Sequence, residues 1–167
     1  MTRKPNYTNF PSTLEELEIT QHYLEIQKAR FPDRFDFSFD IDHSLDSART
    51  LKLILQPVVE NSVKYAFDPE KGRTQLSITT RREENDFVYE VIDNGVGFEV
   101  PSNLFERKKS NPEAKSTGFG LYNVQERIKL EYGKNYGLKV VSILHQGTKV
   151  TITLPLLSED QSPSPSQ

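Results

Sequence analysis

Residues 91–98, Val-Ile-Asp-Asn-Gly-Val-Gly-Phe, contain the strongest candidate for ligand chemistry in this chain. An apolar strand ends there in Asp93, and Gly95 and Gly97 follow two residues apart. The carboxylate could accept a hydrogen bond from the exocyclic amine of a purine, and the glycines would let the backbone pass close to the ring. The alternative is a β-hairpin, because Asn-Gly after a strand is a strong hairpin signal. Pro101 argues against a central returning strand.

A helix expected at residues 51–67 carries a second set of candidates on its polar face, which is formed by Glu60, Asn61, Lys64 and Tyr65. Their spacing of three or four positions makes them neighbours on a helix surface. The amide oxygen of Asn61 suits Mg²⁺, and the ammonium of Lys64 is a point charge for a phosphate. The alternative is an ordinary solvated face with one Glu–Lys pair. Pro57 lacks a backbone donor, so we expect a kink or a break in the first turns.

A third candidate is the start of a helix expected to run from Gly118 to about Tyr132. Gly118 and Gly120 could let backbone amides face an anion, and the helix dipole would add to the attraction. Alone this is weak evidence, because small residues precede many helices as caps.

Residues 99–117, which precede this helix, are long for a loop, and loops of this length are usually functional lids or disordered. The apolar face of the helix is expected to consist of Leu121, Val124, Ile128 and Leu130.

The composition narrows the class of protein. The 167 residues suffice for one domain with a substantial core, and the net charge is −3. Acids and bases are mixed along the chain, so nucleic-acid binding has a weak electrostatic basis. Cysteine is absent, which excludes a disulfide framework or a thiolate metal site. Nothing in the sequence resembles a membrane span or a signal peptide, so we expect no membrane contact by this piece.

The remaining helix and strands are predicted from capping residues, prolines and the spacing of apolar residues along the chain. A helix is expected at residues 13–31, opened by a capping box of Thr13 and Glu16 and ended by Pro32. Residues 42–50 are expected to form a loop. A broad apolar stripe for packing on the first helix is predicted from Leu14, Leu17, Ile19, Tyr23, Leu24 and Ile26. Strands are predicted at residues 35–41, 76–80, 87–92, 138–144 and 149–156.

Three motifs stand in a fixed order along the chain: the helix with Asn61, the segment from Asp93 to Gly97, and the glycines at 118 and 120. Together they resemble the motifs of the GHKL superfamily, the ATP-binding fold shared by histidine kinases, Hsp90, gyrase and MutL. They correspond to the N box and to the first and second glycine boxes. Residues 146–148, Gln-Gly-Thr, look like the final glycine segment. Residues 55–65 and 121–128, together with the first helix, are similar to those of LytS-like sensor histidine kinases.

This resemblance implies an α+β fold of the Bergerat type. The fold is a two-layer α/β sandwich, in which helices back a mixed and mostly antiparallel sheet. The implied catalytic domain covers residues 13–157. Residues 1–12 would be a linker remnant, and residues 158–167 a disordered tail, as their polar, Pro- and Ser-rich composition also suggests.

The resemblance also implies roles for the site residues. Asn61 would coordinate Mg²⁺, Lys64 would approach the phosphates of ATP, and Tyr65 would approach the ribose or base. Asp93 would receive the adenine amine. Glu60 would be a possible participant through an ordered water. The other residues implied at the nucleotide are Gly95, Gly97, Thr117, Gly118, Phe119, Gly120, Leu121 and Thr148.

The function implied is that of the Mg-ATP-binding catalytic domain of a two-component sensor histidine kinase. It would donate the γ-phosphoryl to a His on a dimerisation segment that this chain lacks, so alone it is expected to bind ATP without autophosphorylating. The parent would be a homodimer in the bacterial inner membrane, with this domain in the cytoplasm and a response regulator downstream. The alternative is a nucleotide-gated interaction module without phosphotransfer.

Two departures from the family pattern accompany this resemblance. Pro57 stands where many relatives have a second polar residue, one turn before the Mg-binding Asn, and this disfavours ATP hydrolysis. The phosphorylated His of the family lies in a motif upstream. None of His22, His43 and His145 is in such a motif.

Overall fold

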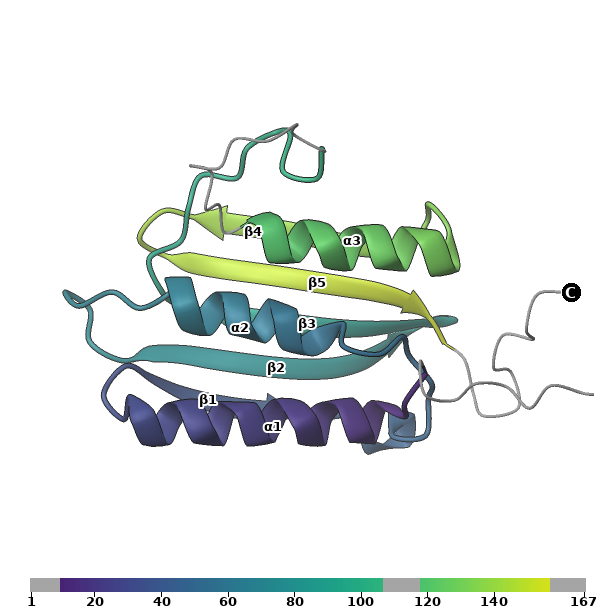
Figure 1. The fold of residues 1–167 in the computed structure, drawn as a ribbon, viewed down its shortest axis with the longest axis horizontal. Helices are drawn as coiled ribbons and strands as arrows, with labels where there is room; N and C mark the ends of the chain where they lie inside the picture. The colour runs from purple at the N-terminus through teal and green to yellow at the C-terminus, as the bar shows by residue number, and fades with distance from the viewer. Residues whose placement is uncertain (1–9, 107–117, 157–167) are drawn as a thin grey trace, which may run out of the picture.

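Five strands form one mixed sheet in the computed structural model, which describes residues 10–106 and 118–156. The order across the sheet is β1-β2-β3-β5-β4 (Figure 1). β1 pairs with β2 in parallel, and the other three pairings are antiparallel. The predicted mixed, mostly antiparallel sheet is therefore confirmed. The strands are β1 (Phe35–Asp40), β2 (Thr74–Glu83), β3 (Asp86–Asp93), β4 (Gly137–Ile143) and β5 (Gly147–Pro155).

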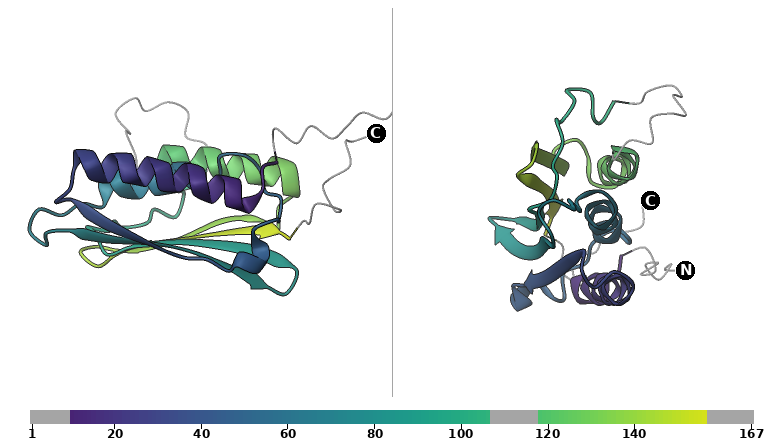
Figure 2. Two further views of the ribbon diagram at one scale, coloured as in Figure 1. Left: turned by 90° about the horizontal axis from the view of Figure 1, so that it is seen from below. Right: turned by 90° about the vertical axis from the view of Figure 1, so that its left-hand side faces the viewer.

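Three helices, α1 (Thr13–Arg30), α2 (Leu55–Tyr65) and α3 (Gly118–Tyr132), cover one face of this sheet. Figure 2 shows them all on the same side, and Figure 1 shows α2 between α1 and α3. The predicted two-layer α/β sandwich is thus confirmed. The loop expected after β1 contains a short 3-10 helix, η2 (His43–Leu45). Among the described residues, no helix has the length and apolar character needed to cross a membrane.

The core lies between the two layers and is apolar on both sides. Inward-facing residues alternate along the strands, as in Leu76 and Ile78 of β2. Phe87 and Tyr89 of β3 are fully buried, with ring centroids 4.6 Å apart. The helices contribute residues at helical spacing, among them Leu55, Val58, Val59, Leu121, Val124 and Ile128.

The start of α1 differs from the prediction. The capping box is formed by Ser12 and Glu15, which exchange hydrogen bonds with each other's backbone amides. The predicted box of Thr13 and Glu16 is wrong, because both side chains are buried and used for tertiary contacts. The Thr13 hydroxyl donates to the carbonyl of Ala48 at 3.0 Å. Glu16 accepts from the backbone amide of Leu53.

The apolar stripe predicted for α1 is also only partly buried. Leu17 and Leu24 are buried, but three other members are exposed: Leu14, Ile19 and Ile26. The packed face instead follows Thr13, Glu16, Leu17, Thr20 and Leu24, at the helical spacing expected for one face. Leu130 of α3 is 85% exposed, so its predicted place on the apolar face is wrong as well.

α2 begins four residues later than predicted. Leu51 and Ile54 are buried, but they precede the helix. Between them Leu53 has a φ of 57°, which an α-helix does not accommodate. Pro57 is the third residue of α2, where a backbone amide has no partner within the helix. The proline therefore lies in the first turn of α2, where it removes no helical hydrogen bond, and α2 continues without a break to Tyr65.

Candidate functional site

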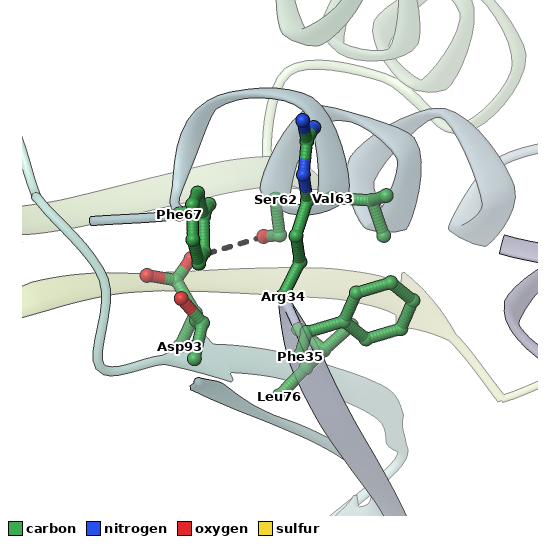
Figure 3. Close-up of a pocket in the computed structure, with 8 residues that line it drawn as sticks. Arg34, Phe35, Ser62, Val63, Phe67, Leu76 and Asp93 are labelled. Carbon is green, nitrogen blue, oxygen red and sulfur yellow. Dashed lines mark hydrogen bonds between the residues drawn. The ribbon is translucent and has the colours of Figure 1, made fainter. Parts of the chain in front are cut away.

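Asp93 is the last residue of β3, and its side chain is only 5% exposed. Each carboxylate oxygen accepts one hydrogen bond from the protein. The Ser62 hydroxyl of α2 donates to Oδ2 at 3.0 Å, and the backbone amide of Gly95 donates to Oδ1 at 3.0 Å. Figure 3 shows the first of these bonds crossing between the helix and the sheet. The backbone amide of Thr148 also donates toward this carboxylate. The two oxygens together have about four lone-pair sites, so acceptor capacity remains for a donor from a ligand.

Burial raises the pKa of the Asp93 carboxyl, while hydrogen bonds from Gly95 and Ser62 oppose this shift. Burial acts this way because it disfavours the charged form. These hydrogen bonds offset part of the free-energy cost of burying a charged carboxylate at Asp93. A buried acceptor held in one orientation by donors of the protein is suited to recognising a single donor group of a ligand.

A cavity of about 160 Å³ opens beside this carboxylate. Its wall brings together residues from three segments that are distant in the sequence. Five of the predicted site residues line it, namely Asn61, Tyr65, Asp93, Gly97 and Thr148. In the described part of the chain, no hydrogen bond occupies the side-chain amide of Asn61. An amide oxygen and a buried carboxylate therefore face one hollow.

The loop after Asp93 passes between the end of α2 and the turn that joins β4 to β5. The amide of Val96 donates to the carbonyl of Ala66 at 2.8 Å, and the amide of His145 donates to the carbonyl of Val96 at 2.6 Å. The loop does not return as a strand, and β3 is already paired with β2 and β5 on its two sides. The hairpin alternative is therefore wrong.

The two glycines of this loop are required by the protein's own backbone. A Cβ on Gly95 would lie 2.0 Å from the carbonyl oxygen of Ala66. Gly97 has a φ of 61°, and a Cβ there would lie 2.1 Å from the carbonyl oxygen of Ile143. Both distances are far inside van der Waals contact, so no side chain fits. Gly97 also lines the cavity, whereas Gly95 contributes the amide that holds Asp93.

Two predicted residues of α2 lie elsewhere. Glu60 and Lys64 line a separate groove between α1 and α2, and neither is among the described residues that line the cavity at Asp93. Glu60 accepts a hydrogen bond from Gln56 at 3.0 Å. The contact predicted between Lys64 and a phosphate of ATP stays a prediction.

The second glycine box lies at the start of α3. Gly118 is the first residue of the helix, and Gly120 is exposed with open space where a Cβ would lie. The side chain of Leu121 is fully buried in the core, so only its backbone could contact a ligand. Thr117 lies outside the described residues, and the structure gives no side-chain placement for Phe119. The roles predicted for these residues stay predictions.

The sequence reasoning missed four residues of the cavity wall: Ser62, Ala66, Val96 and Phe98. Ser62 carried a signal, because it is the single hydroxyl on an otherwise apolar face of α2 and follows Asn61 directly. A buried hydroxyl usually has a hydrogen-bond partner, and that partner is Asp93. The other three could not be found by type, because their contribution depends on the path of the loop.

A family model described as histidine kinase-, DNA gyrase B-, and HSP90-like ATPase matches residues 46–158. The chain belongs to this family. The match contains both Asn61 and Asp93, so it covers the cavity described above.

The curated relatives are sensor kinases. The sensor histidine kinase YesM of Bacillus subtilis is 34% identical over 145 residues, which cover 87% of this chain and 24% of YesM. The sensor protein LytS of Staphylococcus saprophyticus is 34% identical over 149 residues, which cover 88% of this chain and 25% of LytS. The chain thus spans about a quarter of the length of these relatives. They do not favour the alternative of an interaction module without phosphotransfer.

Solved structures agree on the fold. The catalytic domain of histidine kinase ThkA superposes with a TM-score of 0.66 at 18% identity, covering 88% of this chain and 97% of that domain. The Acinetobacter baumannii histidine kinase AdeS gives a TM-score of 0.64 at 14% identity, covering 88% of this chain and 66% of AdeS. At these identities the likeness shows a shared fold, which is that of histidine kinase catalytic domains.

Proposed function

We propose that this chain binds Mg-ATP as the catalytic domain of a two-component sensor histidine kinase and donates the γ-phosphoryl to a His on a separate dimerisation segment. One observation carries the proposal: Asn61 and Asp93, from distant segments, line the same cavity. Membership of the family of histidine kinase-like ATPases and the likeness to sensor kinases support it.

Base selection follows from the chemistry of Asp93. An ionised carboxylate only accepts hydrogen bonds, so it favours the amine of adenine. Guanine presents a carbonyl at the same edge, which would be a second acceptor facing the first. The proposal therefore includes a preference for ATP over GTP.

The residues of the site fit a Mg-nucleotide. About 160 Å³ of cavity is less than the roughly 300–1,000 Å³ of a complete small-molecule pocket, so its described walls suit the base end of ATP. Within residues 10–106 and 118–156, no group of three or more His, Asp or Glu could hold a metal alone. Mg²⁺ commonly binds through one or two protein ligands, phosphates and water, and Asn61 could be such a ligand. The bound ion would neutralise charge on the phosphates.

The wider assignments are part of the same proposal. Residues 13–157 would form the catalytic domain, residues 1–12 a linker remnant and residues 158–167 a disordered tail. The parent would be a homodimer in the bacterial inner membrane that holds this domain in the cytoplasm and passes its phosphoryl group to a response regulator. The names of the relatives, sensor histidine kinase and sensor protein, support these roles.

Nucleotide titration followed by phosphotransfer tests the proposal. With Mg²⁺ present, the wild type is expected to bind ATP more tightly than GTP, and Asp93→Ala is expected to lose this preference. Mixing the wild type with a His-bearing dimerisation segment and labelled ATP is expected to give acid-labile phosphate on the His. Equal affinity for ATP and GTP would refute the nucleotide assignment, and ATP binding without transfer would refute the kinase assignment.

A further inference from the structure

A groove of about 410 Å³ lies between the C-terminal halves of α1 and α2. It shares no lining residue with the 160 Å³ cavity at Asp93 and has more than twice the volume of that cavity. A third hollow of only about 10 Å³ lies between them, lined by Asp93 on one side and by Arg34, Phe35 and Val63 of the groove on the other. The two larger hollows lie on different flanks of α2. A volume of this size falls within the roughly 300–1,000 Å³ of small-molecule pockets. The groove is therefore large enough to be a site of its own.

Three cations face this groove, and they are Arg30, Arg34 and Lys64. All three are exposed, and in the described ranges none of them has an ion-pair partner. Glu60 is the one acid that lines the groove. Three positive charges against one negative charge leave a local charge of +2, in a chain whose net charge is −3. This local excess of positive charge is suited to an anion.

Nearby acids do not neutralise these cations, because other bases already hold them. Asp33 and Asp36 belong to the same turn and strand as Arg34. Arg73 of the neighbouring segment pairs with Asp33 at 3.6 Å and with Asp36 at 3.3 Å. Lys28 also pairs with Asp36. The arginines of the groove therefore remain available to a ligand.

Aromatic rings form the apolar part of the groove. The guanidinium groups of Arg30 and Arg34 lie 5.2 Å and 4.3 Å from the ring centroid of Phe31, and cation–π attraction holds both near this ring. Figure 3, which draws the small neighbouring hollow at Asp93, shows the Arg34 side chain beside α2, with Phe35 next to its base. Tyr23 contributes a third ring and a hydroxyl. Burial and the charge of Glu60 raise the pKa of Tyr23 to about 12, so this hydroxyl keeps its proton at neutral pH.

We propose that this groove is a second ligand site, which binds a small phosphomonoester carried on a flat apolar body. A phosphomonoester has a charge of about −1.5 to −2 at pH 7, which matches the local charge. The guanidinium forks of Arg30 and Arg34 suit phosphate oxygens. The flat body would lie against the ring of Tyr23, since the guanidinium groups of Arg30 and Arg34 already lie over Phe31. The limited volume of the groove favours a small molecule over an acidic peptide.

Titration with phenyl phosphate tests this site, measured by isothermal titration calorimetry on the full chain. We expect saturable binding to one site in the wild type. In the double variant Arg30→Gln/Arg34→Gln we expect about a tenfold or larger loss of affinity, because charge-assisted hydrogen bonds are lost. Both side chains are exposed, so the variant is expected to fold. Arg82→Gln, an exposed arginine of β2 outside the groove, is the matched control and is expected to stay within about twofold of the wild type.

Two further arms separate this site from the nucleotide cavity and test the rings. Phenyl phosphate is expected to bind Asp93→Asn as it binds the wild type, and excess ATP is expected not to displace it. Displacement by ATP, or loss of binding in Asp93→Asn, would show that phenyl phosphate binds in the cavity at Asp93 and would overturn the proposal. Inorganic phosphate is expected to bind more weakly, and equal affinity would overturn the role of the rings. No saturable binding of phenyl phosphate at millimolar concentration, or binding of an acidic peptide alone, would overturn the site itself.

Discussion

Two of the carboxylates that are buried in the described part of this domain, Asp93 and Glu16, have opposite surroundings. Asp93 is 5% exposed and Glu16 is 1% exposed, and burial raises the pKa of both. Asp93 has a protein donor at each oxygen and borders a cavity. Glu16 accepts from the amide of Leu53 through Oε1, while its Oε2 has no hydrogen-bond partner among the described residues. Glu16 lines neither the cavity at Asp93 nor the groove between α1 and α2.

The contacts of Glu16 show that this buried side chain stabilises the fold by joining two helices. It extends from α1 to the residues just before α2. From the other side, Arg127 of α3 donates to the carbonyls of Lys52 and Leu53. All three helices are thus joined through residues 52 and 53, where Leu53 has its positive φ. Glu16 and Arg127 together stabilise the turn that sets where α2 begins.

The comparison shows that a buried acid with a raised pKa does not by itself mark a ligand site. Perturbed pKa values cluster at functional sites, but structural contacts also produce them. What distinguishes Asp93 is an adjoining cavity with unused polar groups on its wall. Substitutions at the two acids are therefore expected to separate binding from stability.

The largest expected difference is in nucleotide affinity. Asp93→Asn is expected to lower ATP affinity about 10- to 100-fold, because a hydrogen bond to a charged group contributes about 1.5–3 kcal/mol. Glu16→Gln is expected to leave ATP affinity within about twofold, since Glu16 does not line the cavity at Asp93. Isothermal titration calorimetry with Mg²⁺ measures both. Asp86→Asn, at the other end of β3, is the matched control. Similar losses of ATP affinity in Asp93→Asn and Glu16→Gln would contradict the different roles of the two acids.

The second difference is in stability. Glu16→Ala is expected to lower the free energy of unfolding by about 1–3 kcal/mol, because the amide of Leu53 would be left without its acceptor. Glu16→Gln keeps an acceptor at the same place and is expected to retain most of the stability. Urea unfolding followed by circular dichroism measures the difference. If Gln destabilises the protein as much as Ala, the hydrogen bond to Leu53 is not the cause.

A smaller effect is expected at the partner of Asp93. Ser62→Ala removes the donor to Oδ2 and leaves that oxygen less well held. A typical hydrogen bond contributes about 0.5–1.5 kcal/mol, so ATP affinity is expected to fall about two- to tenfold. Ser62→Thr retains the hydroxyl and is the matched control. An unchanged affinity in Ser62→Ala would show that the backbone amides of Gly95 and Thr148 suffice to orient the carboxylate.

Much of this arrangement was predictable from the sequence, because the strands alternate cleanly and the three ATP-binding motifs stand in order. The convergence of Asn61 and Asp93 was predicted through the family resemblance and is seen in the cavity. The sequence does not show which hollow each side chain of α2 lines. Residues 61 and 64 are neighbours on α2, but about 60° separates them around its axis, and they line different hollows. The wrong helix cap arose because tertiary contacts decide: Ser12 and Thr13 both suit a cap, and the contact of Thr13 with Ala48 decides between them.

The smallest effect is expected in the pH dependence of stability. A carboxyl whose pKa is raised in the folded state binds more protons there than in the unfolded chain. Its contribution to stability is present below the unfolded pKa, about 4 for Asp and Glu, and is lost as the pH rises through the folded pKa. Glu16→Gln and Asp93→Asn cannot titrate at these positions. Each is therefore expected to gain stability relative to the wild type as the pH rises from 4 to 7.

Urea midpoints for the wild type and both variants, taken at half-unit steps of pH, measure this change. Asp86→Asn again serves as the control, and its difference from the wild type is expected to stay nearly flat over the same range. The two acids differ in one respect that the experiment can resolve. ATP present during unfolding is expected to change the curve of Glu16→Gln as it changes the wild type, because Glu16 lies outside the cavity, and to change that of Asp93→Asn much less. A flat difference for both variants without ATP would mean that burial does not perturb either carboxyl.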